Sequence, residues 1–221
     1  MEITIDISLK EAAPLLAIGA VFATVEVTKH DPVLWTEIDK RVADIVAQTT
    51  LHSVPEMPEV KALRDAYRVL GKDPSRYRGS QESLLRRVLQ GKGLFRINTA
   101  VDINNLVSLE SAHSVGCYDA ERLQPPVTFR VGKAGEAYRG IGKESINLDG
   151  LPVFADGAGP FGSPTSDSER AMITLNTREI MMLIIAFSGS AGLSQFAERA
   201  TTLLSKYAKA RPETLQYKSI S

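Results

Sequence analysis

The segment with the clearest chemical character is the strongly basic stretch Lys61–Arg96. It holds ten Lys and Arg residues against three acidic ones, which gives it a net charge of +7. The whole chain of 221 residues has 26 basic and 26 acidic residues, so the remainder carries −7. A local basic surface on a neutral chain is a common footprint of nucleic-acid binding, because cations neutralise backbone phosphates. The stretch therefore predicts an RNA or DNA contact.

Two amphipathic helices are expected to present these cations. Between about Pro58 and Leu70 the apolar residues fall on one side and the cations on the other, and Gly71 is expected to end the helix. Ser80 is expected to cap a second helix that runs to about Gln90. The turn between them interleaves cations with an aromatic ring suited to stacking on a base. The predicted RNA contacts are Arg64, Arg68, Arg76, Tyr77, Arg78, Arg86 and Arg87.

The alternative interpretation of the same residues is structural. Charged stripes on exposed helices usually do no more than face solvent. The compensating charge of −7 elsewhere in the chain favours a directed surface over a merely solvated one.

A longer ordered string of residues carries a family resemblance. It reads GKDPSRYRGSQESLLRRVLQGKG from Gly71 and INTAVDINNLVSLESAHSVGCYDAERL from Ile97. The string resembles the B3/B4 domain of the phenylalanyl-tRNA synthetase beta subunit, which also occurs as free-standing small proteins. The resemblance covers roughly residues 61–185. It implies an α+β fold of mixed sheets with flanking helices, and tRNA or aminoacyl-tRNA as the partner.

The same resemblance implies a pocket. In that family the domain hydrolyses tyrosine wrongly attached to the phenylalanine tRNA, with hydrogen-bond donors and a positioned water rather than a protein nucleophile. Side-chain amides both donate and accept, which suits an ammonium group or a ribose hydroxyl. The alternative is that the asparagines tie down loops and that the glycine-rich segment is an ordinary surface loop. The implied pocket residues are Asn104, Asn105, His113, Gly157, Gly159 and Gly162.

Three departures from the family pattern leave the catalytic residues unassigned. Asn104 stands where the family has a threonine, Gly116 where the bacterial members have a histidine, and Met182 near their tyrosine-reading acid. We therefore expect a single domain over residues 1–221 that binds tRNA or aminoacyl-tRNA, with hydrolysis of mischarged tRNA in trans as an open question. The alternatives are a non-catalytic binder of an amino-acid-like metabolite and a module that docks on an aminoacyl-tRNA synthetase. No ATP-binding motif supports a complete ligase.

Other chemistries find little support in the sequence. The single cysteine excludes an internal disulfide and fits a reducing cytoplasm. One cysteine and three scattered histidines have no metal-ligand spacing, so neither a metal nor a cofactor is expected. His113 and Cys117 could meet on one helical turn as base and nucleophile, but no third residue orients them. The apolar run Ile180–Phe187 is too short for a membrane span, and the N-terminal residues do not resemble a signal peptide.

The remaining elements follow from periodicity and caps. Asp31 and Pro32 predict the start of a helix that runs to about Thr49, and further helices are expected within Gly93–Leu109 and over Ala191–Ala208. The segment from Gly157 to Arg170 is expected to be a loop, and the tail from Arg211 to be loose. Strands are expected over Glu2–Ser8, Ile18–Val27, Val127–Val131, Glu136–Arg139, Leu151–Asp156, Met172–Leu175 and Ile180–Phe187.

Overall fold

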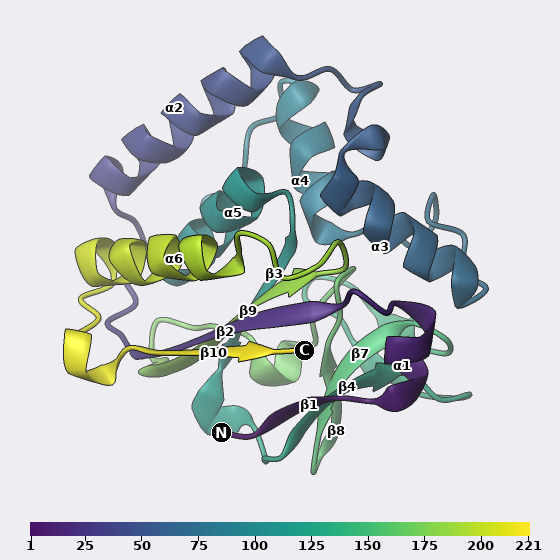
Figure 1. The fold of residues 1–221 in the computed structure, drawn as a ribbon. Coiled ribbons are helices and arrows are strands. Elements are labelled where there is room, and N and C mark those ends of the chain that lie inside the picture. The colour runs from purple at the N-terminus through teal and green to yellow at the C-terminus, as the bar shows by residue number, and fades with distance from the viewer.

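A four-stranded antiparallel sheet forms the middle layer of the protein, which a computed structural model describes over residues 1–221. We call it the central sheet. Its strand order is β10-β2-β9-β3, and Figure 1 shows helices above it and further strands below it. Its strands are β2 (Ala17–Thr24), β3 (Ser114–Asp119), β9 (Glu179–Ala186) and β10 (Gln216–Ile220).

A second four-stranded sheet, which we call the outer sheet, packs on one face of the central sheet. Its order is β1-β4-β7-β8, and only the β1–β4 pair is parallel. Its strands are β1 (Ile3–Ile5), β4 (Val127–Val131), β7 (Pro152–Asp156) and β8 (Gly159–Gly162). A separate hairpin pairs β5 (Ala137–Arg139) with β6 (Ser145–Asn147).

Helices cover the other face of the central sheet. The helices α5 (Thr99–Ser111) and α6 (Leu193–Tyr207) lie against it, and α2 (Pro32–Gln48) packs beside α5. The helices α3 (Pro58–Val69) and α4 (Ser80–Leu89) stand at one side of this layer, and the short α1 (Ile7–Ala12) lies near β4 (Figure 1). The observed class is therefore α+β with mixed sheets and flanking helices, as the sequence predicts.

Strand β9 explains how the layers hold together. Its residues alternate between two hydrophobic cores. Met182 and Ile184 face the helices, whereas Met181 and Leu183 face the outer sheet, and all four are fully buried. A strand with a core on each face needs apolar residues at every position, which is why the continuous run from Ile180 is a strand.

Most predicted elements are confirmed within a few residues. Asp31 accepts hydrogen bonds from the backbone of Val33 and Leu34 and so caps α2. Gly71, with φ of 73°, ends α3 in a left-handed turn, and Gly91 does the same for α4.

Five predictions are wrong. Ser80 does not cap α4, because the capping position is Gly79 and no side chain bonds the first turn of the helix. Residues 2–8 form only the short β1, because Asp6 caps α1 with its side chain. Met172–Leu175 is no strand: Met172 ends the 3-10 turn Glu169–Ala171, and the chain turns again where the Thr177 backbone donates to the Thr174 carbonyl. The segment from Gly157 contains strand β8, and the tail from Arg211 contains β10, which pairs with β2 along its whole length.

Candidate nucleic-acid interface and pocket

The predicted basic face lies on α3, on α4 and on the turn between them. Its centre is a buried carboxylate. Glu82, on the first turn of α4, is 1% exposed and meets three arginines. Its oxygens lie 3.0 Å from Arg64 Nη1, 2.8 Å from Arg86 Nε and 3.3 Å from Arg78 Nε. One negative charge thus fixes three guanidinium groups, and the cluster keeps a net charge of +2.

A hollow of about 410 Å³ opens beside this cluster. No carboxylate and no apolar residue lines it. Arg87 and Lys92 contribute cations that form no ion pair with a carboxylate. The Arg87 guanidinium donates one hydrogen bond, to the Lys92 carbonyl at 3.3 Å. Such a hollow attracts anions of phosphate type. We call it the α4 hollow; its lining residues are Arg78, Ser83, Arg86, Arg87, Gln90 and Lys92.

The other predicted RNA contacts differ in availability. Arg76 is exposed and has no ion pair, whereas Arg68 is paired with Asp65 on its own helix. Tyr77 is partly buried and packs on the core between the two sheets, with Lys72 Nζ 5.7 Å from its ring centroid. Its ring therefore presents less surface for stacking than the sequence suggests.

The two asparagines of the implied pocket lie on α5. Asn104 is 9% exposed, and its side-chain nitrogen lies 3.5 Å from Asn105 Oδ1. Asn104 Oδ1 is buried without any hydrogen-bond partner. A buried acceptor left unpaired costs about 1–3 kcal/mol. Among the predicted pocket residues, Asn104 is therefore the one with the clearest need for a hydrogen-bond donor.

His113 lies between the end of α5 and the start of β3. It is 3% exposed and packs edge-on against Phe196 of α6, with ring centroids 6.1 Å apart. Burial lowers the pKa of His113 to about 4, so the ring is neutral at pH 7. Burial also raises the pKa of the Cys117 thiol. Because Cys117 lies on a strand and not on a helix, the predicted helical meeting of these two residues is wrong.

The glycines belong to the outer sheet. Gly157 lies in the turn between β7 and β8 and Gly159 is the first residue of β8, whereas Gly162 is buried against Tyr118 of β3. A Cβ on Gly162 would lie 2.3 Å from the Tyr118 hydroxyl oxygen, and one on Gly116 would lie equally close. The space between these two glycines is therefore filled by the chain's own tyrosine.

The six implied pocket residues do not share a hollow. None of them lines any of the five principal hollows of the surface. The asparagine helix packs on the helical face of the central sheet, whereas Gly162 belongs to the opposite side. Met182 also faces the helices, while Gly116 and its cross-strand neighbour Leu183 face the outer sheet. Position 116, where the bacterial members have a histidine, and position 182, near their tyrosine-reading acid, thus lie on opposite faces of the central sheet.

A cluster of tyrosine hydroxyls that sequence reasoning missed surrounds the loop after β8. Tyr118 donates to Asp167 Oδ1 at 2.8 Å, and Tyr67 lies 2.7 Å from Thr165 Oγ1. Tyr138 donates to the Ser166 carbonyl. Burial raises the pKa of Asp167 to about 6, although the hydrogen bond from Tyr118 by itself lowers this pKa. The loop is thus tied to α3, β3 and β5, and the only sequence signal was its density of Ser, Thr and Asp.

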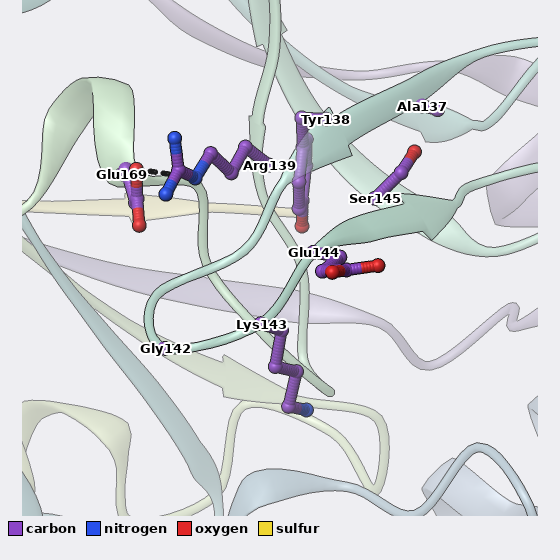
Figure 2. Close-up of a pocket in the computed structure, with 8 residues that line it drawn as sticks. All are labelled: Ala137, Tyr138, Arg139, Gly142, Lys143, Glu144, Ser145 and Glu169. Atoms are coloured by element: carbon purple, nitrogen blue, oxygen red, sulfur yellow. Dashed lines mark ion pairs between the residues drawn. The ribbon is translucent and has the colours of Figure 1, made fainter.

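The largest hollow lies elsewhere, beside the β5–β6 hairpin. It measures about 730 Å³ and is open to solvent. Figure 2 shows Arg139 and Glu169 joined by an ion pair at one side of it, with Lys143 and Glu144 on the loop of the hairpin. Charges of both signs line it, and it contains no residue of the predicted site.

Two further classes of feature are absent from the described chain. No group of three or more His, Cys, Asp or Glu side chains is arranged to hold a metal ion. None of the helices combines the length and apolar character needed to cross a bilayer.

The chain is similar to known proteins of one family. The B3/4 domain model matches residues 62–209. The phenylalanine–tRNA ligase beta subunit of Rhodospirillum rubrum is 35% identical over 86 residues, which are 38% of this chain and 11% of that protein. The crystal structure of an N-terminal fragment of the phenylalanyl-tRNA synthetase beta subunit from Pyrococcus horikoshii covers 100% of this chain and 50% of its own, with a TM-score of 0.48 and 13% identity.

Proposed function

This chain belongs to the B3/4 domain family, and from that premise we propose that it binds tRNA or aminoacyl-tRNA. The observation that carries the proposal is the α4 hollow, where Arg78, Arg86, Arg87 and Lys92 converge and no carboxylate lines the wall. Part of the chain is similar to a protein named as a beta subunit of phenylalanine–tRNA ligase, so tRNA is the nucleic acid to expect. Docking on an aminoacyl-tRNA synthetase is the second partnership that this relation suggests.

The arrangement of charge supports backbone contact. Phosphate oxygens accept hydrogen bonds from guanidinium groups, and each neutralised phosphate releases counterions. Glu82 holds Arg78 and Arg86 in place at the edge of the hollow, so little side-chain entropy is lost when an anion binds. Arg87 and Lys92 have no such acidic partner and are free to pair with the ligand.

Binding is better supported than ester hydrolysis. His113 is neutral and packed against Phe196, and burial raises the pKa of Cys117, so neither presents an activated base or nucleophile. Tyr118 fills the space between Gly116 and Gly162. Deacylation of mischarged tRNA therefore needs to be tested only if the protein is found to bind tRNA.

The test is binding of purified protein to total tRNA across a salt series. We expect affinity to fall steeply with salt, with a slope worth several phosphate contacts. Lys92→Glu should weaken binding and make the slope shallower by at least about one contact. The matched control is Lys133→Glu, an exposed lysine without an ion pair in the turn before β5, which should bind as wild type does.

Absence of binding at low salt would overturn the proposal. The metabolite alternative rests on the unpartnered Asn104 Oδ1 and would then be examined by thermal shift against amino acids. Co-purification of a synthetase would instead support the docking alternative. If tRNA does bind, mischarged and correctly charged tRNAs distinguish a deacylase from a binder, because only the former would release the wrong amino acid.

A further inference from the structure

Phe95 is an aromatic side chain exposed in the middle of the basic segment. It is 63% exposed and lies between α4 and α5. One face of its ring is covered by Arg87, whose guanidinium carbon lies 3.7 Å from the ring centroid. This distance is that of a close cation–π stack. Because the ring is largely exposed, its remaining surface does not pack against the protein core.

The backbone on both sides of Phe95 is fixed by side chains. Arg87 donates from Nη2 to the Lys92 carbonyl at 3.3 Å. On the other side, the Ile97 backbone donates to Asp102 Oδ1 at 3.1 Å, while Asp102 Oδ2 accepts from Trp35 Nε1 at 2.7 Å. Asp102 is 1% exposed, so this anchor belongs to the core. The exposed ring is therefore held on a short, doubly anchored segment.

Cations lie on both sides of the ring. Before it in the chain comes the α4 hollow, to which Arg87 and Lys92 belong. After it comes a hollow of about 240 Å³, which we call the α2 hollow because it lies at the start of that helix, lined by Lys29, His30, Arg96 and Ile97. The Arg96 guanidinium carbon lies 4.6 Å from the ring centroid of Trp35. Neither hollow has an acidic lining residue.

We propose that Phe95 and Arg87 form a stacking platform for an unpaired RNA base, with the flanking phosphates in the α4 and α2 hollows. The inference rests on the proposed RNA binding and deepens it, because it names the form of RNA that is recognised. In a duplex both faces of a base are covered by its neighbours, whereas a base in a single strand offers a free face. An aromatic ring between two cationic sites is how proteins hold single strands without reading their sequence.

The charges favour RNA over a protein partner. A protein that covered Phe95 would have to place Arg87, Lys92 and Arg96 against its own surface, with a large acidic patch to match. A single strand supplies a phosphate at every nucleotide and a base between phosphates, which fits the observed alternation of cation, ring and cation. The sequence pattern predicts the stacking role for Tyr77, but the ring of Tyr77 is partly buried.

The experiment compares four forms of the protein on two labelled RNAs. The RNAs are a single strand of twelve nucleotides and a blunt-ended duplex of the same length in which every base is paired. Phe95→Leu keeps apolar volume but removes the ring; Phe95→Tyr keeps the ring; Lys92→Glu alters a phosphate contact only. Melting temperatures of all variants should equal that of wild type, because both side chains are exposed.

We expect Phe95→Leu to weaken single-strand binding roughly tenfold, a typical loss for one stacked base, with an unchanged salt slope. Phe95→Tyr should bind as wild type does, and the fully paired duplex should not distinguish any Phe95 variant. Single-strand affinity of Phe95→Leu equal to that of wild type would overturn the inference. If Lys92→Glu still weakened binding in that case, the proposed function would stand. Failure of wild type to bind either RNA would remove both.

Discussion

The hydroxyl of Tyr118 donates a hydrogen bond of 2.8 Å to Asp167 Oδ1, between two glycines that leave room for it. Gly116 belongs to the same strand as Tyr118, and Gly162 lies on β8 of the facing sheet. The ring also packs at 4.9 Å from that of Phe161. The chain thus supplies its own phenol to a site made of glycine backbone, an aromatic wall and a carboxylate, and this relationship has measurable consequences.

Asp167 should make stability depend on pH. Burial raises the pKa of this carboxyl from its ordinary 3.8 to about 6. Between these values the folded protein binds the proton more tightly than the unfolded chain, so this contribution is full below pH 4 and is lost as pH rises through 6. We expect the unfolding free energy of wild type, relative to Asp167→Asn, to fall by up to about 3 kcal/mol between pH 3.5 and 7. Urea unfolding at intervals of one pH unit measures the difference.

Tyr118→Phe provides the matched comparison for the pH dependence of the unfolding free energy. The Tyr118 hydrogen bond lowers the pKa of Asp167, so its removal should move the decline in stability to higher pH. Parallel curves for wild type and Asp167→Asn would mean that the carboxyl is solvated in the folded protein.

Gly162→Ala should destabilise the protein by overpacking. The new Cβ would lie 2.3 Å from the Tyr118 hydroxyl oxygen and within 2.7 Å of two ring carbons, in a ring that is fully buried. Such insertions typically cost about 1–3 kcal/mol. Gly157→Ala is the control, because a Cβ on this exposed glycine would come no closer than 3.3 Å, to the Gln124 carbonyl oxygen, and the substitution should cost clearly less than Gly162→Ala. Equal effects of the two substitutions would contradict the close packing of Tyr118.

Local signals made much of the fold predictable. Asp31 followed by Pro32 marks a helix start by side-chain capping, and Gly71 marks a helix end because it adopts a positive φ. The run from Ile180 is apolar at every position because two cores meet on β9. These features depend on neighbours in the sequence or on burial alone, and both are visible in residue types.

Long-range pairing was not predictable in the same way. β10 has four exposed residues among five, so no apolar alternation indicates a strand, and its partner β2 lies about two hundred residues earlier in the chain. The candidate site shows the same limit. The density of cations revealed the basic face, but not that Glu82 is buried among three of them. Resemblance pointed to Gly162, but could not show that Tyr118 occupies the space beside it.

Glu82→Gln should lower stability and raise RNA affinity together. The substitution leaves Arg64, Arg78 and Arg86 close to one another without a counterion, at a cost of about 3 kcal/mol. The same loss of negative charge makes the α4 hollow more positive, so tRNA should bind more tightly at low salt. Screening weakens repulsion among the partly exposed arginines, so added salt should reduce the stability defect. Chemical denaturation in urea and a binding titration, each at two salt concentrations, measure these effects.

The control for Glu82 is Glu198→Gln. Glu198 is exposed on α6, its carboxylate has no ion pair, and the substitution removes the same charge. It should leave stability within about 0.5 kcal/mol of wild type. A fall in RNA affinity for Glu82→Gln would show that the three arginines must be held in their present geometry in order to bind.

Tyr118→Ala should create a site for a small phenol. Removal of a fully buried ring leaves a cavity between Gly116, Gly162 and Phe161 and typically costs about 3–5 kcal/mol. Phenol can refill the space and donate to Asp167, so it should raise the melting temperature of the variant. Benzene, which lacks the hydroxyl, should raise it less, because Asp167 would keep the Ser163 backbone donor but not regain the phenolic one. Wild type should respond to neither, since its own tyrosine occupies the site. A wild-type response to phenol would show that the Tyr118 ring can leave it.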